Sequence, residues 1–179
     1  MTIKPWKILG SSRLYKNIRI DKCELPDGKA YDVTVLEYRD WVTIIALTKD
    51  QQVVLERQYR HGVQKTILEF PGGGMDAEDE SPQHAARREL LEETGFTSNT
   101  LIPLGCISPD PANHTNLMHP FLALDAERIS DQDLDATEEI EVVLKPLTEV
   151  IEMAKNGELL QSMHVSTLFL ALAYLDRIV

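Results

Sequence analysis

Runs of apolar residues separated by turn-forming residues predict a series of β-strands. Residues 41–48 form a continuous apolar run, and residues 52–60 follow it after Lys49-Asp50. Such runs are typical of buried strands, so we expect two central strands joined by a tight turn. Residues 6–15 form either a short strand or coil. Further strands are predicted at residues 18–24, 30–38, 66–69, 101–107, 117–124 and 140–142.

A helix is predicted between Ser81 and Gly95. Ser81 is a good N-cap residue, and Pro82 suits the first helical position because no amide donor is needed there. Gly95 readily adopts the left-handed conformation that ends a helix. We therefore expect a helix over residues 82–94, preceded by a glycine-rich loop.

Two more helices are predicted near the C-terminus. Apolar residues recur at helical spacing over residues 147–156, with Thr148 as the expected cap and Gly157 as the stop. Residues 164–178 form a second, more apolar helical segment. We expect both helices to pack on the sheet.

Three carboxylates lie on one face of the predicted helix 82–94. Glu89, Glu92 and Glu93 are spaced i, i+3, i+4, so their side chains project together and repel one another. Arg88 offsets this repulsion only in part. A solvated acidic face would be the ordinary interpretation, but carboxylates gathered in this way also suit Mg²⁺, which prefers oxygen ligands.

Composition and charge narrow the classes of partner. The 179 residues, of which 43% are hydrophobic, predict one globular unit with a core of its own. The formal net charge is −11, from 29 acidic and 18 basic residues. This balance argues against a nucleic acid or an anionic membrane as the partner. If the substrate is a pyrophosphate, an acidic pocket needs a metal to accept it.

The sequence also predicts a cytoplasmic protein. No stretch approaches the roughly 18 uninterrupted apolar residues of a membrane span, and the first residues lack the hydrophobic segment of a signal peptide. Cys23 and Cys106 are far apart and have no metal-ligand spacing, so we expect reduced thiols.

A longer pattern surrounds the three carboxylates. Gly74 is followed by five residues and Glu80, then by seven residues and the run Arg88-Glu89-Leu90-x-Glu92-Glu93-x-Gly95-Phe96. This pattern resembles the signature of the Nudix hydrolases at every fixed position. The resemblance implies an α/β fold, an α/β/α sandwich with a mixed sheet. It also implies hydrolysis of a nucleoside diphosphate linked to another group, with Mg²⁺ or Mn²⁺ held by Glu89, Glu92 and Glu93.

The N-terminal strands resemble those of the ADP-ribose pyrophosphatase branch of this family. In that branch such strands pair with a second subunit, which implies a homodimer here. The resemblance therefore divides the chain into an N-terminal antiparallel β region, residues 1–40, which would serve dimerisation, and a Nudix domain, residues 41–179.

Substrate contacts are also implied by this branch. Gln58-Tyr59-Arg60 resembles a Gln-(Phe/Tyr)-Arg segment whose arginine contacts the substrate phosphates, so Arg57 and Arg60 are candidates, although arginines at strand ends are also common in surface ion pairs. Pro111 occupies the position of a proline that is characteristic of this branch and follows the signature pattern of residues 74–96, called the Nudix box below. Trp41, Tyr38 and Trp6 are candidates for stacking on adenine, with burial in the core as the alternative.

The glycine-rich loop departs from the family pattern. Residues 69–74 read Glu-Phe-Pro-Gly-Gly-Gly, which is one residue longer than the usual segment before the box glutamate. Gly74 is the box glycine when counted back from Glu80, whereas Gly73 is the box glycine when counted forward from Phe70. The carbonyl ligand of the metal is therefore left open among Gly72, Gly73 and Gly74.

The catalytic base is expected in the acidic loop before residues 140–142, because relatives place a glutamate there. Glu138 fits that register best and Glu139 second, with Glu93 as the further catalytic carboxylate. Glu80 and Arg88 are expected to orient the loop and the helix. His114 and His119 are weaker candidates, because loop histidines are more often structural or solvated.

Alternative functions stay open at this point. GDP-mannose, dinucleoside polyphosphates or a broader set of nucleotide sugars could be the substrate. The chain could also be a Nudix-fold sensor that binds a nucleotide sugar without cleaving it. Such sensors usually lack box carboxylates, and all three are present here.

Overall fold

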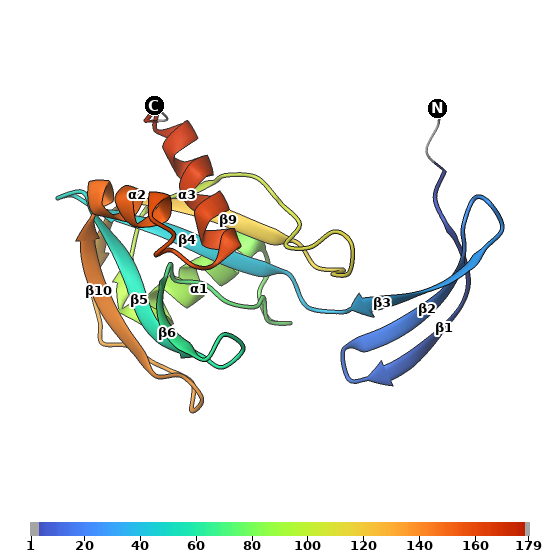
Figure 1. Cartoon of the computed structure of the whole chain (residues 1–179). Helices are drawn as coiled ribbons and strands as arrows, with labels where there is room; N and C mark the ends of the chain where they lie inside the picture. Colours follow the sequence, from blue (N-terminus) through green and yellow to red (C-terminus); the bar gives the residue numbers. More distant parts are fainter. Residues whose placement is uncertain (1–3, 178–179) are drawn as a thin grey trace. The chain divides into compact units, whose positions relative to one another are not determined.

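The computed structural model describes residues 4–177, and these residues form two compact units (Figure 1). The first unit contains the residues up to Arg39 together with Ser108–Leu117. The second contains Asp40–Ile107 and the residues from Met118 onward. The division of the chain into a dimerisation region, 1–40, and a Nudix domain, 41–179, stays a prediction.

The first unit is built on a three-stranded antiparallel sheet in the order β1-β2-β3. Its strands are β1 (Lys7–Tyr15), β2 (Ile18–Glu24) and β3 (Ala30–Leu36). The segment 108–117 attaches to the end of β3, because the Leu36 amide donates to the Asn113 carbonyl and the Thr115 amide donates to the Leu36 carbonyl. Every residue of β1 is exposed.

A seven-stranded mixed sheet forms the centre of the second unit. Its main path runs β10-β5-β4-β9-β7, with β6 paired to β5 and β8 paired to β9. The pair β4–β9 is parallel and the other pairs are antiparallel. The strands are β4 (Trp41–Thr48), β5 (Gln52–Arg60), β6 (Lys65–Glu69), β7 (Phe96–Thr97), β8 (Thr100–Pro103), β9 (Met118–Arg128) and β10 (Ile140–Pro146).

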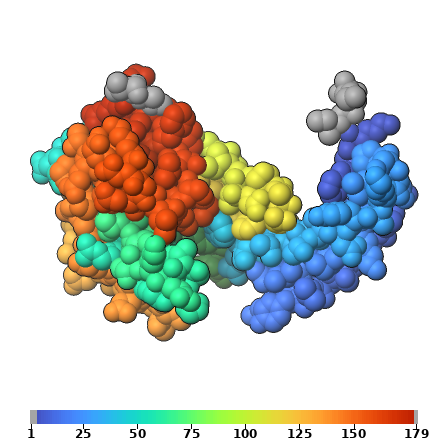
Figure 2. All heavy atoms as spheres, viewed as in Figure 1, coloured from blue at the N-terminus to red at the C-terminus, as the bar shows by residue number. Residues whose placement is uncertain are grey.

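Alternating residues of β4 point to opposite faces of this sheet, and each face carries a helical layer. Val42 and Ile44 belong to a core cluster that includes Leu90 of α1 (Pro82–Thr94). Ile45 belongs to a second cluster with residues of α2 (Leu147–Lys155) and α3 (Ser162–Tyr174). The α/β/α sandwich with a mixed sheet is therefore confirmed (Figure 1). Figure 2 shows α2 and α3, in orange and red, side by side on one face of this unit.

Helix α1 begins and ends as its sequence predicts. The Ser81 hydroxyl accepts a hydrogen bond from the His84 amide at 3.1 Å, which satisfies one of the free donors of the first turn. Gly95 has φ 74°, and its amide donates to the Leu91 carbonyl. A Cβ atom at Gly95 would lie 2.2 Å from the Ser130 carbonyl oxygen, so the position requires glycine for space as well as for conformation.

The capping prediction for the next helix was wrong. Thr148 lies inside α2, and Pro146 holds the N-cap position without a side-chain hydrogen bond. Strand β10 runs directly into the helix, and the Leu147 amide donates to the Gln51 carbonyl at 3.1 Å. The turn at Gln51 therefore satisfies the first amide of the helix without a side-chain cap.

One strand extends further than expected. Strand β9 continues to Arg128, into the segment expected to be an acidic loop, and pairs there with the two-residue strand β7. Among residues 4–177, no helix combines the length and the apolar character needed to span a membrane. Cys23 and Cys106 are free thiols, as predicted.

Candidate active site

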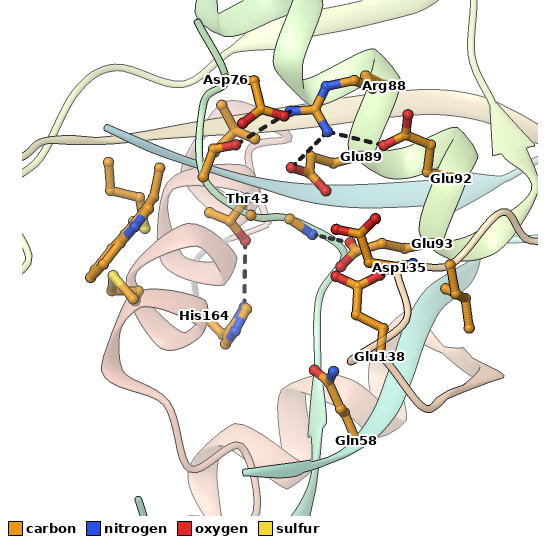
Figure 3. A pocket seen from close by; sticks show the side chains of 18 of the residues that line it. Thr43, Gln58, Asp76, Arg88, Glu89, Glu92, Glu93, Asp135, Glu138 and His164 are labelled. Atoms are coloured by element: carbon orange, nitrogen blue, oxygen red, sulfur yellow. Dashed lines mark hydrogen bonds and ion pairs between the residues drawn. The ribbon is translucent and has the colours of Figure 1, made fainter. Parts of the chain in front are cut away.

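A cavity of about 730 Å³ in the second unit brings the box carboxylates together (Figure 3). Glu89, Glu92 and Glu93 of α1 all line it, so their predicted common face points into one space. Strand ends, loops and the first turn of α3 supply the other walls. These other lining residues include Trp41, Gln58, Arg60, the three loop glycines Gly72–Gly74, Met118, Glu138, Met163 and His164.

The two deepest carboxylates of α1 are nearly enclosed by protein. Glu89 is 8% exposed and Glu93 is 5% exposed. Burial disfavours the charged form and raises the pKa of Glu89 to about 7, although the Arg88 guanidinium opposes this shift. Burial likewise raises the pKa of Glu93 to about 8, opposed by the Gly72 amide, which donates to Glu93 Oε2 at 2.8 Å. A cation at this wall would relieve both shifts.

Arg88 connects the helix to the glycine-rich loop. Its Nη1 lies 3.0 Å from Glu89 Oε1 and 3.0 Å from Glu92 Oε2. Its Nη2 donates to Asp79 Oδ2 at 2.8 Å and to the Gly74 carbonyl at 3.3 Å. Arg88 is therefore placed for the orienting role expected of it (Figure 3).

The partner of Arg88 in the loop is Asp79. The Asp79 side chain is only 1% exposed, and the Asp76 amide and the His84 ring also contact it. Glu80, the residue expected to orient the loop, is exposed. The extra residue in the glycine-rich loop is the sequence signal for this difference. When the pattern is counted forward from Phe70, the position of the box glutamate falls on Asp79, one residue before Glu80.

Close packing against α1 explains one glycine of the loop, Gly73. A Cβ atom on Gly73 would lie 2.6 Å from Glu89 Oε1. The Gly73 carbonyl accepts a hydrogen bond from the Val42 amide at 2.9 Å, and the Gly74 carbonyl accepts from Arg88. Which glycine carbonyl would bind a metal stays a prediction.

Two buried glutamates behind the cavity were missed by the sequence analysis. Glu56 of β5 is 2% exposed and Glu69 of β6 is 1% exposed, and the two residues are register partners. Burial, together with the neighbouring Glu93, raises the pKa of Glu56 well above its usual range. Glu56 Oε1 has no hydrogen-bond partner among the described residues. The sequence did contain a signal for Glu56, because Glu56, Gln58 and Arg60 alternate along β5 and therefore share one face of the strand.

The predicted substrate-binding residues fall into three groups. Trp41 and Arg60 line the cavity. Arg57 lies on the other face of β5, and its Nη1 pairs with Glu141 Oε2 at 2.6 Å. Tyr38 and Pro111 belong to the first unit. The binding roles of all five residues stay predictions.

Of the two candidate bases, Glu138 lines the cavity and Glu139 is an exposed residue beside it in the chain. Glu138 Oε2 accepts a hydrogen bond from the Asp135 amide at 3.0 Å. Figure 3 shows Glu138 and Asp135 close to Glu93. His119, a weaker candidate, pairs with Asp40 at 2.9 Å.

The donor set fits a hard divalent cation. Among the described residues, no group of three or more His, Cys, Asp or Glu side chains forms a ready-made cage for a metal. Mg²⁺ does not need such a cage, since it is usually bound by one or two carboxylates, waters and substrate phosphates. The buried carboxylates Glu89 and Glu93 supply oxygen ligands of this kind.

The α/β/α sandwich and the carboxylate-lined cavity define the class of protein that the sequence pattern implied, a Nudix hydrolase. The NUDIX domain family model matches residues 37–163, so the chain belongs to the NUDIX family. The prediction of this family is confirmed.

Two relatives and one solved structure support the same assignment. The chain is 30% identical over 176 residues to "ADP compounds hydrolase NudE" of Escherichia coli (strain K12), covering 97% of this chain and 92% of the relative. It is 28% identical over 143 residues to "ADP-ribose pyrophosphatase" of Bacillus subtilis (strain 168), and the match covers 79% of this chain and 77% of the relative. A crystal structure of an ADP compounds hydrolase superposes on this chain with a TM-score of 0.86 and 26% sequence identity. The match covers 99% of this chain and 100% of the chain in that structure.

Proposed function

We propose that the chain hydrolyses the diphosphate of ADP-ribose, or of a related nucleoside diphosphate sugar, to a nucleoside monophosphate and a sugar phosphate. One observation carries the proposal: a single cavity joins the carboxylates of α1 to Arg60, a cation suited to phosphate. The names of the relatives, an ADP-ribose pyrophosphatase and an ADP compounds hydrolase, support this substrate class.

The reaction would need a divalent cation, Mg²⁺ or Mn²⁺. Glu89, Glu92 and Glu93, with a carbonyl of Gly73 or Gly74, would hold it. When bound, the cation polarises the attacking water and screens the negative charge of the diphosphate.

The other residues of the cavity would bind the substrate and move a proton. Arg60 would donate to the phosphate oxygens, and Trp41 would stack on the base. Glu138 would take the proton of the attacking water, with Glu139 as the second candidate. Arg57 would have to leave its ion pair with Glu141 to reach the phosphates. Tyr38 and Pro111 complete the proposed substrate contacts.

A product assay tests this proposal. The protein is incubated with ADP-ribose, GDP-mannose and a dinucleoside polyphosphate, each with Mg²⁺, with Mn²⁺ and with a chelator. We expect metal-dependent release of AMP from ADP-ribose. Preferential cleavage of GDP-mannose or of the dinucleoside polyphosphate would establish an alternative substrate. Binding of a nucleotide sugar without any product would establish a sensor and contradict the proposal.

We also infer a homodimer, located in the cytoplasm. Ile8, Leu9, Leu14 and Tyr15 of β1 are each more than half exposed, as is Tyr31 of β3. Exposed apolar side chains in this number on a small sheet favour a surface that another chain covers. The free thiols Cys23 and Cys106 agree with a reducing compartment.

A further inference from the structure

A buried carboxylate holds the guanidinium of Arg60 through its Nε atom. Its side chain is 45% exposed and lines the cavity, while its Nε donates to Glu69 Oε2 at 2.6 Å. The Glu69 side chain is 2% exposed, so this partner has little freedom to move. The contact uses Nε and leaves both Nη groups of the guanidinium for an anion, the arrangement that suits bidentate phosphate binding.

The other oxygen of Glu69 faces a buried histidine. His164, in the first turn of α3, is 6% exposed, and its Nε2 lies 3.5 Å from Glu69 Oε1. Its ring packs edge-on against Phe70, with 5.4 Å between the ring centroids and an interplanar angle of 73°. The ring is therefore fixed in orientation by its neighbours.

The protons of His164 can be assigned from its contacts. Nδ1 accepts a hydrogen bond from the Phe70 backbone amide at 3.3 Å and lies 3.4 Å from Thr43 Oγ1 (Figure 3). Because Nδ1 is an acceptor, the single proton of the neutral ring is on Nε2, the atom nearest Glu69. Burial lowers the pKa of His164 to about 3, which keeps the ring neutral at pH 7.

We propose that His164 is a positioning residue for the substrate diphosphate, because it fixes Glu69 and thereby the guanidinium of Arg60. The inference rests on the proposed function, in which Arg60 binds the phosphates. The chain of contacts runs from α3 through β6 to β5, so the C-terminal helix helps to set the geometry of the phosphate site.

A buried histidine that served packing alone would not need to point its Nε2–H at the carboxylate of Glu69. Glu69 is a carboxylate at 1% exposure, and an unpaired charge there would be costly. Arg60 donates to one oxygen of Glu69 at 2.6 Å, and Nε2 of His164 lies 3.5 Å from the other oxygen, a longer polar contact. A leucine of similar volume at position 164 would fill the space and leave Glu69 Oε1 without that donor.

A double-mutant cycle tests the inference. His164→Leu removes the donor, His164→Gln can restore it through its side-chain amide, and Arg60→Ala removes the group being positioned. We expect His164→Leu to raise KM for ADP-ribose about tenfold with a small change in kcat, the size of effect expected for weakening one charge-assisted hydrogen bond. His164→Gln should recover most of the loss. In the Arg60→Ala background, His164→Leu should add nothing.

The control is Leu168→Ala, which removes a buried side chain of the same helix that is 3% exposed and belongs to the core cluster around α2 and α3. It should lower the melting temperature without raising KM. An equal rise in KM for His164→Leu with and without Arg60, or an equal rise for Leu168→Ala, would overturn the inference.

Two readouts are independent of turnover. If the wild-type protein cleaves no nucleotide sugar, the proposed function fails, and the cycle is then measured through the dissociation constant for AMP by calorimetry. Nitrogen-15 NMR should show the neutral Nε2–H tautomer of His164 at pH 7. A signal of the Nδ1–H tautomer would contradict the assigned direction of the contact with Glu69.

Discussion

At the scale of single residues, the cavity concentrates carboxylates whose burial has an energetic cost. Glu89 and Glu93 have pKa values of about 7 and about 8, both above the ordinary value of 4.5. Burial is the main cause of both shifts, and for Glu93 the charge of Glu89 adds to it. The site is therefore destabilising for the fold in the absence of a cation.

The pH dependence of stability follows from these two groups. Between about pH 4.5 and pH 8, the metal-free folded state binds more protons than the unfolded state, so stability falls as the pH rises through this window. We expect the melting temperature without metal to decrease from pH 5 to pH 8. Mn²⁺ should raise it more at pH 8 than at pH 5, because binding then has to displace fewer protons from the two carboxylates.

Scanning calorimetry at the two pH values, with Mn²⁺ and with a chelator, measures this effect. Glu93→Gln is the matched variant, since it cannot ionise, and it should flatten the pH dependence. A melting temperature that changes with pH equally in both proteins would count against the assignment.

At the scale of elements, the glycine-rich loop and α1 are joined by one arginine. Arg88 contacts Asp79 and the Gly74 carbonyl on the loop side, and Glu89 and Glu92 on the helix side. Its guanidinium holds the pKa of Asp79 well below the usual range for aspartate. The contact therefore fixes the loop against the carboxylates that face the cavity.

Substitution at the two neighbouring acidic positions separates Asp79 from Glu80. Asp79→Asn should cost about 1–3 kcal/mol, because it weakens charge-assisted bonds at a buried site. Glu80→Gln should cost less than about 0.5 kcal/mol, as is usual for an exposed residue. Urea unfolding at pH 7 measures both. Equal losses of unfolding free energy in the two variants, or a larger loss for Glu80→Gln, would indicate that Glu80 and not Asp79 orients the loop.

Local signals predicted most elements well. The bounds of β2, β4, β5 and α1 agree with the sequence because turns, apolar runs and caps specify them over short distances. Strand β7 has only two residues and exists through its pairing with β9, so no periodicity marks it. Thr148 was misjudged as a cap because the helix begins one residue earlier, at Leu147, whose amide donates to the Gln51 carbonyl of a turn distant in sequence.

The site shows the same limit. The spacing of Glu89, Glu92 and Glu93 was enough to place them on one face, since it depends only on helix geometry. The group formed by Glu69 and His164 could not be predicted, because β6 and α3 meet only in the folded chain.

At the scale of the whole molecule, the second unit contains the cavity and the first presents exposed apolar residues. Leu14 and Tyr15 of β1 are each 69% exposed, and Tyr31 of β3 is 56% exposed. Exposed apolar side chains on a small sheet gain stability when another chain covers them. The proposed homodimer would supply that cover.

Light scattering during size-exclusion chromatography tests the dimer. The wild-type protein should have twice the mass of one chain, and Leu14→Asp should shift it toward the monomer, since burying a carboxylate in an apolar interface is costly. The control is Leu144→Asp, at a β10 residue of the second unit that is 47% exposed, and it should stay dimeric. A monomeric wild-type protein at micromolar concentration would contradict the homodimer.

The most direct test of the account is the turnover of ADP-ribose by Glu93→Gln and Glu92→Gln in Mg²⁺ buffer, with unchanged circular dichroism as evidence of an intact fold. The account predicts that kcat falls by roughly a hundredfold to ten-thousandfold, the loss typical for a catalytic carboxylate. Wild-type turnover by both variants would contradict the claim that the carboxylates of α1 hold the cation used for hydrolysis.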